Sequence, residues 1–194
     1  MAANNQLYLA SASPRRKTLL TQIGITFQTL SVEVSEEIHN GESPKNYADR
    51  LALAKAQAGW LSHKRTENCP VLGADSIVVL NDMVLGKPKD KDDSIRMLLL
   101  LSGNTHEVIT SVAVVQGDKI TTACSISRVK FREISLDEAQ AYWDTHEPVD
   151  KAGGYAVQGK AAVFVEHIAG SYSGIMGLPL FETAALLKEF GIQA

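Results

Sequence analysis

The chain has 194 residues, a length that suits one domain with a well-buried core. Hydrophobic residues make up 45% of it and charged residues 21%, which are ordinary globular values, and no apolar run is long enough to span a membrane. The formal net charge of −3 argues against a general nucleic-acid binder, because phosphate contacts require a basic surface. We therefore expect a single domain over residues 1–194, with no nucleic-acid partner and no membrane partner.

The amino-terminal segment, the cysteines and the histidines narrow the class further. Met1–Gln6 lacks the basic and apolar pattern of a secretory signal, which predicts a cytoplasmic protein. Cys69 and Cys124 lie far apart without a C-x-x-C pattern, so neither a disulfide framework nor a zinc site is expected. The five histidines show no metal-ligand spacing. Any bound metal should therefore be a hard cation held by oxygen ligands.

The first predicted element is a short buried strand over Leu7–Ala10, followed by a helix that begins at Pro14. Proline is favoured at the first helical position, which makes Ser13 the expected N-cap. The pair Arg15–Arg16 then lies in the first turn, where its charge opposes the helix dipole. Two interpretations stay open: a solvated helix start, or an anion bound by N–H groups, the Ser11 and Ser13 hydroxyls and a guanidinium.

The rest of the chain alternates between strand and helix patterns, which predicts an α/β sheet of mixed direction. The expected elements of the first half are a strand over Phe27–Val34, a helix from Ser43–Pro44 with an apolar stripe of Tyr47, Leu51, Ala54 and Ala58, buried runs over Pro70–Ala74 and Ile77–Leu80 that together resemble a central strand broken by a polar residue, and an irregular segment Val84–Pro88. Those of the second half are a helix over Asp92–Leu101, a hairpin of Thr105–Gln116 and Lys119–Arg132, a helix from a Ser135–Glu138 capping box through Trp143, an irregular segment Asp150–Gly159, a strand over Ala161–Ile168 and a helix over Pro179–Phe190.

Asp75 interrupts an otherwise apolar stretch in the middle of the chain. A carboxylate between two buried runs is costly unless it is paired, bound to a metal or directed into a cleft. The residues alone leave two interpretations: an aspartate that forms a turn after Gly73, or a general base or metal-bearing carboxylate.

The segment Gly154–Lys160 nearly matches the P-loop pattern G-x-x-x-x-G-K-[ST]. Ala161 stands where the magnesium-binding hydroxyl would be, and Ala162–Val165 predicts a strand where a P-loop continues into a helix. We therefore do not expect a P-loop ATPase. The glycines indicate either a close backbone approach to a ligand, with Gln158 displayed beside it, or a glycine-rich turn.

Five separated motifs form a second, independent signal. They are Ala10–Arg16, Gly73–Ser76, Gly86–Pro88, Asp150–Gly153 with Gln158–Gly159, and Gly170–Tyr172 with Gly177–Leu180. In this order they resemble the motifs of the Maf family of nucleoside triphosphate pyrophosphatases, from about Leu7 to Phe190. The resemblance implies a Maf/ITPase-like fold, in which a mixed twisted sheet with flanking helices forms a nucleotide-binding cleft.

The resemblance also implies an activity. Arg15–Arg16, Ser76 and Gln158 are similar to the branch that hydrolyses dTTP and UTP, and unlike the branch that acts on 7-methyl-GTP. CTP and modified pyrimidine nucleotides are further substrates to be expected. The products would be the nucleoside monophosphate and pyrophosphate. The family is linked to removal of noncanonical nucleotides and to cell-division arrest, and the resemblance suggests a homodimer.

Site residues follow from the same resemblance. Asp75 matches the family's catalytic base, and a divalent cation, Mg²⁺ or Mn²⁺, would be held by Asp75 and Glu36. Glu37 stays an alternative to Glu36, because Ser35 stands where many members have aspartate. The catalytic set implied is Asp75, Glu36, Lys55 and Lys87, and the substrate-binding set is Ser11, Arg15, Arg16, Ser76 and Gln158.

Without the resemblance, Glu36 would be interpreted as a solvated loop residue and Lys55 and Lys87 as surface lysines. A rival function from another class is a nucleotide-binding regulator of septum formation that does not turn over. The sequence favours the enzyme, because a binder would not need the base at Asp75.

Overall fold

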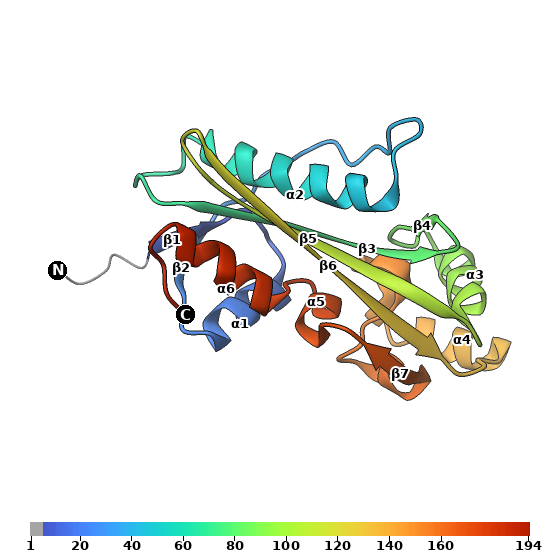
Figure 1. Cartoon of the computed structure of the whole chain (residues 1–194). Helices are drawn as coiled ribbons and strands as arrows, with labels where there is room; N and C mark the ends of the chain where they lie inside the picture. Colours follow the sequence, from blue (N-terminus) through green and yellow to red (C-terminus); the bar gives the residue numbers. More distant parts are fainter. Residues whose placement is uncertain (1–5) are drawn as a thin grey trace.

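A computed structural model describes residues 6–194 (Figure 1). Its centre is a seven-stranded sheet in the order β2-β1-β3-β5-β6-β7, with β4 paired to β3. The strands are β1 (Gln6–Leu9), β2 (Thr26–Thr29), β3 (Val71–Leu80), β4 (Met83–Leu85), β5 (Thr105–Gln116), β6 (Lys119–Phe131) and β7 (Val165–Ala169). Strand β1 runs parallel to β2 and β3, and the other pairs are antiparallel. The predicted α/β class with a mixed sheet is confirmed.

Helices cover both faces of this sheet (Figure 1). They are α1 (Pro14–Gln22), α2 (Pro44–Trp60), α3 (Lys91–Leu101), α4 (Leu136–Trp143), α5 (Tyr172–Met176) and α6 (Leu180–Glu189), with short 3₁₀ helices η1 (Glu147–Asp150), η2 (Ala152–Gly154) and η3 (Lys160–Phe164). The expected hairpin forms β5 and β6, and the expected capping box begins α4 at Ser135. None of the helices described within residues 6–194 is both long and apolar enough to cross a bilayer.

Helix α2 lies on one face of β3 and β5, and it packs unusually close to β3. Gly73 permits this approach, because a Cβ at that position would collide with the backbone of Ala52 and Ala56. Alternate residues of β3 share a face, so Asp75 points to the same side as Gly73. The close packing therefore brings Lys55, on α2, above Asp75.

Part of β3 forms a free sheet edge. Strand β1 pairs with β3 through Leu9 and Leu72 and then ends, and β4 begins to pair only at Val78. Among the described residues, no strand pairs with this edge of β3 between these two points, while β5 pairs along the opposite edge. Side chains from both faces of β3 can reach the gap, because β1 leaves the sheet there and turns into α1 (Figure 1).

Several sequence predictions of local structure are wrong. The expected strand Phe27–Val34 is shorter, because β2 ends at Thr29 and the chain then runs without regular structure to α2. The expected strand Ala161–Ile168 begins as the 3₁₀ helix η3 and becomes extended only at Val165. By contrast, the central strand predicted from the two runs around Asp75 is confirmed, and it continues through Asp75, because a side chain perpendicular to the sheet does not interrupt the backbone pairing.

The apolar stripe of α2 was only half predicted, and two elements were missed. Ala52, Ala56 and Gly59 are buried in the last turns of α2, whereas Ala54 and Ala58 are partly exposed. Strand β4 falls in the expected irregular segment, and α5, with only five residues, had no periodic pattern to predict it.

Candidate nucleotide site

A cavity of about 520 Å³ opens at the free edge of β3. Its walls come from the β1–α1 junction, the loop before α2, the segment after β4, the glycine-rich segment and the end of α5. Every site residue predicted from the sequence lines it: Ser11, Arg15, Arg16, Glu36, Lys55, Asp75, Ser76, Lys87 and Gln158. The fold thus brings together residues that lie as far apart in the sequence as Ser11 and Gln158.

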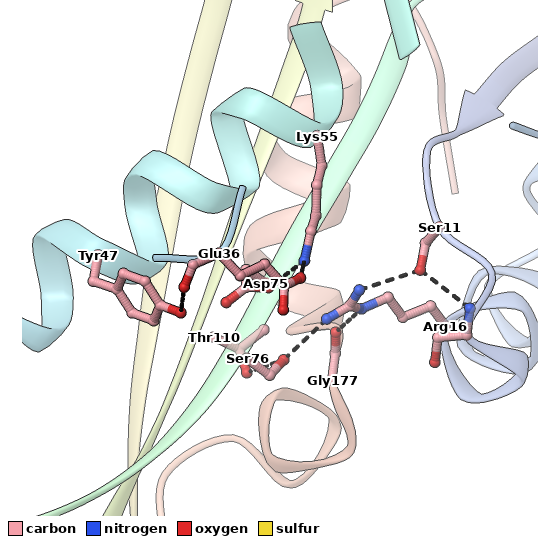
Figure 2. Close-up of polar contacts among 10 residues, drawn as sticks. Ser11, Arg16, Glu36, Tyr47, Lys55, Asp75, Ser76, Thr110 and Gly177 are labelled. Atoms are coloured by element: carbon pink, nitrogen blue, oxygen red, sulfur yellow. Dashed lines mark hydrogen bonds and ion pairs between the residues drawn. The ribbon is translucent and has the colours of Figure 1, made fainter. Parts of the chain in front are cut away.

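Lys55 joins the two acidic residues of the cavity. Its Nζ donates to Asp75 Oδ1 at 2.6 Å and to Glu36 Oε1 at 2.7 Å (Figure 2). The Lys55 and Asp75 side chains are only 15% and 10% exposed, whereas Glu36 is 51% exposed. The three charged groups therefore form one cluster that extends from the sheet toward solvent.

The pKa values of the two carboxyl groups are shifted in opposite directions. Burial raises the pKa of Asp75 above its ordinary value, although the Lys55 charge and hydrogen bond and the Arg16 charge oppose this effect. Partial burial also opposes ionisation of Glu36, but the hydrogen bond from Lys55 and the surrounding positive charges outweigh it, so the pKa of Glu36 is lowered. Relative to their ordinary pKa values, Asp75 is thus shifted toward binding a proton and Glu36 toward staying charged.

The loop that carries Glu36 is fastened to α2. Tyr47 donates its hydroxyl to the Glu36 carbonyl at 2.7 Å (Figure 2). Arg50 donates to the Glu37 carbonyl at 2.8 Å and forms a two-point ion pair with Glu42. These bonds direct the Glu36 side chain into the cavity, while Glu37 is not among the described residues that line it. This geometry favours Glu36 over Glu37 as the acidic site residue.

Arg16 connects the two sides of the free edge. Its Nε donates to the Gly177 carbonyl at 2.8 Å, and its Nη atoms contact Ser11 Oγ at 3.2 Å and Ser76 Oγ at 3.3 Å (Figure 2). Gly177 adopts φ +116°, a backbone conformation that favours glycine and ends α5. Burial lowers the pKa of Arg16, yet a guanidinium keeps its proton in proteins. The result is a fixed positive charge facing the cavity.

The remaining predicted residues lie at the rim. Arg15 donates through Nε to the Met176 carbonyl at 3.2 Å. Lys87 and Gln158 are exposed and line the cavity, and within residues 6–194 neither side chain has a hydrogen-bond partner. Ser13 is the N-cap of α1, but its side chain makes no capping bond. The anion proposed at this helix start therefore stays a hypothesis.

The carboxylates fit a divalent cation that arrives with its ligand. Within residues 6–194 no group of three or more His, Cys, Asp or Glu side chains is placed to hold a metal alone. Asp75 and Glu36 supply two hard carboxylate donors. Magnesium is commonly held by one or two carboxylates together with phosphates and water. The donor set therefore suits Mg²⁺ or Mn²⁺ in the presence of a phosphate ligand.

Sequence reasoning missed several residues of this site. Tyr47 was assigned to an apolar stripe, although its hydroxyl holds the Glu36 loop. Lys151 lies in a recognised motif and its side chain is only 17% exposed in the cavity wall, where it pairs with Asp150. Thr110 contacts Ser76 at 2.9 Å from the middle of β5. The motif around Asp150 was a signal for Lys151, whereas nothing local distinguishes Thr110.

The positively charged side chains and carboxylates that line the cavity indicate the class of protein. This is an α/β protein with a cavity at a sheet edge, and the charges that line the cavity suit phosphate groups. The chain belongs to the Maf-like protein family, whose model matches residues 6–190. The predicted resemblance is thus confirmed over nearly the whole chain.

Relatives with curated names support the same family. A dTTP/UTP pyrophosphatase of Alkalilimnicola ehrlichii is 52% identical over 96% of this chain and 93% of its own length. Another, of Saccharophagus degradans, is 52% identical over 96% and 89%. Among solved structures, the Staphylococcus aureus Ham1 protein aligns with a TM-score of 0.41 and 16% identity over 65% of this chain and 71% of that chain, which is too distant to assign a function.

Proposed function

We propose that this protein hydrolyses dTTP and UTP to the nucleoside monophosphate and pyrophosphate. The observation that carries the proposal is the Lys55 ammonium bound to both Asp75 and Glu36 in a cavity that Arg16 and Lys87 also line. Such a cluster combines a proton acceptor with charges that suit a triphosphate. The names of relatives that share about half of the sequence support the same substrates.

In this proposal Asp75 is the general base. Water attacks the α-phosphorus, an O–P bond forms, and the anhydride bond to the β-phosphate breaks, so pyrophosphate leaves. Asp75 Oδ takes the proton of the water. Its raised pKa makes it a stronger base than an exposed aspartate, while Lys55 keeps it oriented. Arg16, Lys55 and Lys87 would balance the phosphate charge.

Asp75 and Glu36 would hold the divalent cation. When bound, Mg²⁺ or Mn²⁺ would neutralise phosphate charge and acidify water. Gln158 would select the base, because its carboxamide can accept from N3–H and donate to a carbonyl of uracil or thymine. CTP and modified pyrimidine nucleotides remain further candidate substrates. A role in clearing noncanonical nucleotides or in cell-division arrest, a cytoplasmic location, a single-domain organisation and a homodimer stay predictions from the sequence.

Release of pyrophosphate by the purified protein tests this function. We expect turnover of dTTP and UTP with Mg²⁺ or Mn²⁺, and its loss in excess chelator. Full activity in chelator would refute the cation requirement. Nucleotide binding without pyrophosphate release at any metal concentration would instead favour the rival function, a non-catalytic regulator of septum formation.

A further inference from the structure

An internal carboxylate holds the loop that carries Gln158. Glu147, at the start of η1, accepts a hydrogen bond from Lys160 N–H at 2.9 Å through Oε2 and from Ala161 N–H at 3.4 Å through Oε1. Tyr142, on α4, donates its hydroxyl to the same Oε1 at 2.6 Å. An ionised carboxylate can satisfy all three donors, because it is an acceptor only.

Tyr142 also fastens the other end of the loop. Its hydroxyl oxygen accepts the Ala156 N–H at 3.2 Å, so hydrogen bonds run from Ala156 through Tyr142 to Glu147. Within the loop, Gly159 N–H donates to the Ala156 carbonyl at 3.0 Å and closes a turn. Gln158 lies inside this turn and lines the cavity. The turn is therefore tied down on both sides of Gln158.

Gly159 makes the close approach of Glu147 sterically feasible. A Cβ at this position would collide with the Glu147 carboxylate. The same segment nearly matches a P-loop, in which backbone N–H groups bind phosphate. Here the carboxylate of Glu147 occupies the N–H groups of Lys160 and Ala161. One sequence argument against a P-loop was the strand expected after Lys160, and the short 3₁₀ helix η3 forms there instead. The Glu147 carboxylate supplies a new argument, because it already occupies N–H groups that a phosphate would need.

Glu147 is charged at neutral pH and lies outside the cavity. Partial burial opposes its ionisation, but hydrogen bonds from Tyr142, Lys160 and Ala161 outweigh burial and lower the pKa of Glu147. Neither Glu147 nor Tyr142 is among the described residues that line the cavity. An effect of Glu147 on a bound nucleotide must therefore pass through the loop.

We propose that Glu147 is a positioning residue for base selection, which holds the Ala156–Gly159 turn so that Gln158 presents its carboxamide to the base. This inference rests on the proposed function, in which Gln158 contacts uracil or thymine. The Glu147 carboxylate sets the orientation of the turn, and Tyr142 extends its hold to Ala156. A fixed carboxamide discriminates between bases better than a mobile one, because its two hydrogen bonds need defined directions.

Backbone amide exchange of the full-length protein without nucleotide tests the hold directly. Glu147→Gln keeps the shape but places an NH₂ group against an N–H donor. We expect exchange at Lys160 and Ala161 to become about tenfold faster or more, since a hydrogen bond to a charged group is stronger than one to a neutral group. The milder Tyr142→Phe should speed exchange at Ala156. Glu138→Gln is the matched control, because Glu138 caps α4 through Ser135 N–H and does not bond to the loop.

Kinetics with dTTP, UTP and dATP tests the consequence for selectivity. We expect Glu147→Gln to raise KM for dTTP about tenfold, with kcat within about threefold of the parent, and to narrow the preference over dATP. In a Gln158→Ala background the same change should add nothing to the loss of preference, because the effect passes through Gln158. If Glu147 had only a structural role, Glu147→Gln would lower the stability of the protein, but its effect on selectivity would not depend on Gln158.

Two results would overturn the proposal. One is unchanged exchange at Lys160 and Ala161 in Glu147→Gln. The other is a kinetic result that does not depend on Gln158: the loss of selectivity in Glu147→Gln adds fully to that of Gln158→Ala, or the control Glu138→Gln loses selectivity equally. A parent protein that releases no pyrophosphate from dTTP would refute the proposed function instead. The exchange measurement would then still decide whether Glu147 holds the loop.

Discussion

At the scale of single residues, Asp75 has an environment poorly suited to its charge. It lies in the middle of β3 with its side chain 10% exposed, and burial raises its pKa above the ordinary value. A carboxyl group held in such a place lowers the stability of the fold, unless Lys55 fully compensates its desolvation. Since Glu36 also binds Lys55, the lysine would keep a partner if Asp75 were neutral.

We therefore expect Asp75→Asn to separate activity from stability. Loss of the base should lower kcat by about 10²–10⁴-fold, while dTTP still binds. The midpoint of thermal unfolding should stay equal or rise, because the amide needs less solvation than a carboxylate. Pyrophosphate release and a thermal melt on the same sample measure both. A kcat within threefold of the parent would show that Asp75 is structural.

Gln158 gives a second prediction at this scale. Its side chain is exposed in the cavity without a protein partner among the described residues, so a ligand can take all of its hydrogen bonds. Gln158→Ala should raise KM for dTTP and UTP about tenfold and narrow the gap to CTP, dATP and GTP. The assay is kcat/KM for these nucleotides in parent and variant. An unchanged ranking with unchanged ratios would return Gln158 to the status of a turn residue.

The sequence could indicate these residues but not how they are held. Asp75 stands out because a charge in an apolar run is rare, and Arg16 because it opposes a helix dipole. The residues that hold Ser76 and Glu36 give no such signal. Thr110 and Tyr47 lie in ordinary strand and helix patterns, and only the register of β5 and the loop before α2 bring them to Ser76 and Glu36.

At the scale of elements, the segment between β2 and α2 decides where Glu36 lies. It has no regular structure before α2, and it is tied to α2 by Tyr47 and Arg50. Arg50 also bonds Glu42 at 2.6 and 2.8 Å, and this bond lowers the pKa of Glu42 to about 2. Two side chains of one helix thus shape a loop that local sequence leaves undetermined.

Arg50→Gln should therefore impair catalysis from outside the cavity. Loss of the ion pair and of the bond to Glu37 frees the loop, so we expect kcat/KM for dTTP to fall about tenfold, because small misplacements of site groups are costly. Arg96→Gln is the matched control, since Arg96 forms a comparable ion pair with Asp93 at 2.6 Å and does not line the cavity. Equal kcat/KM in the two variants would show that the Glu36 loop needs no such tie.

Elements with a long periodic pattern were predictable, and short ones set by tertiary contacts were not. The β5–β6 hairpin and α4 follow from alternation and a capping box. The stretch Lys160–Phe164 has strand-like residues, yet it forms η3 because Glu147 binds its first N–H groups. Such a long-range hydrogen bond outweighs local propensity.

At the scale of the whole molecule, groups with shifted pKa values change the folding stability in different pH ranges. The pKa of Glu42 and of Glu138 is lowered to about 2 by hydrogen bonds, chiefly from Arg50 and Arg132. A lowered carboxyl pKa stabilises the fold above the ordinary value and loses this contribution as pH falls toward 2. The contribution of Asp75 depends on pH with the opposite sign. Because its pKa is raised in the folded state, folding stability falls as pH rises through the range in which this carboxyl group ionises. Neither kind accounts for a loss of stability between pH 6.5 and 4.5.

We predict that His106 lowers stability between these pH values. It is 1% exposed on β5, its Nε2 lies 2.7 Å from the Tyr155 hydroxyl, and burial lowers its pKa to about 4 from 6.5. Between these values the unfolded chain binds the proton and the folded chain does not, so stability falls as pH falls, by about 2 kcal/mol between pH 7 and 4.5.

His106→Gln cannot titrate and keeps a polar group beside Tyr155. Urea unfolding at both pH values should show a drop smaller by about 2 kcal/mol in this variant, whereas His63→Gln, at an exposed position, should behave as the parent. Equal drops in the parent and His106→Gln would mean that other groups cause the acid sensitivity.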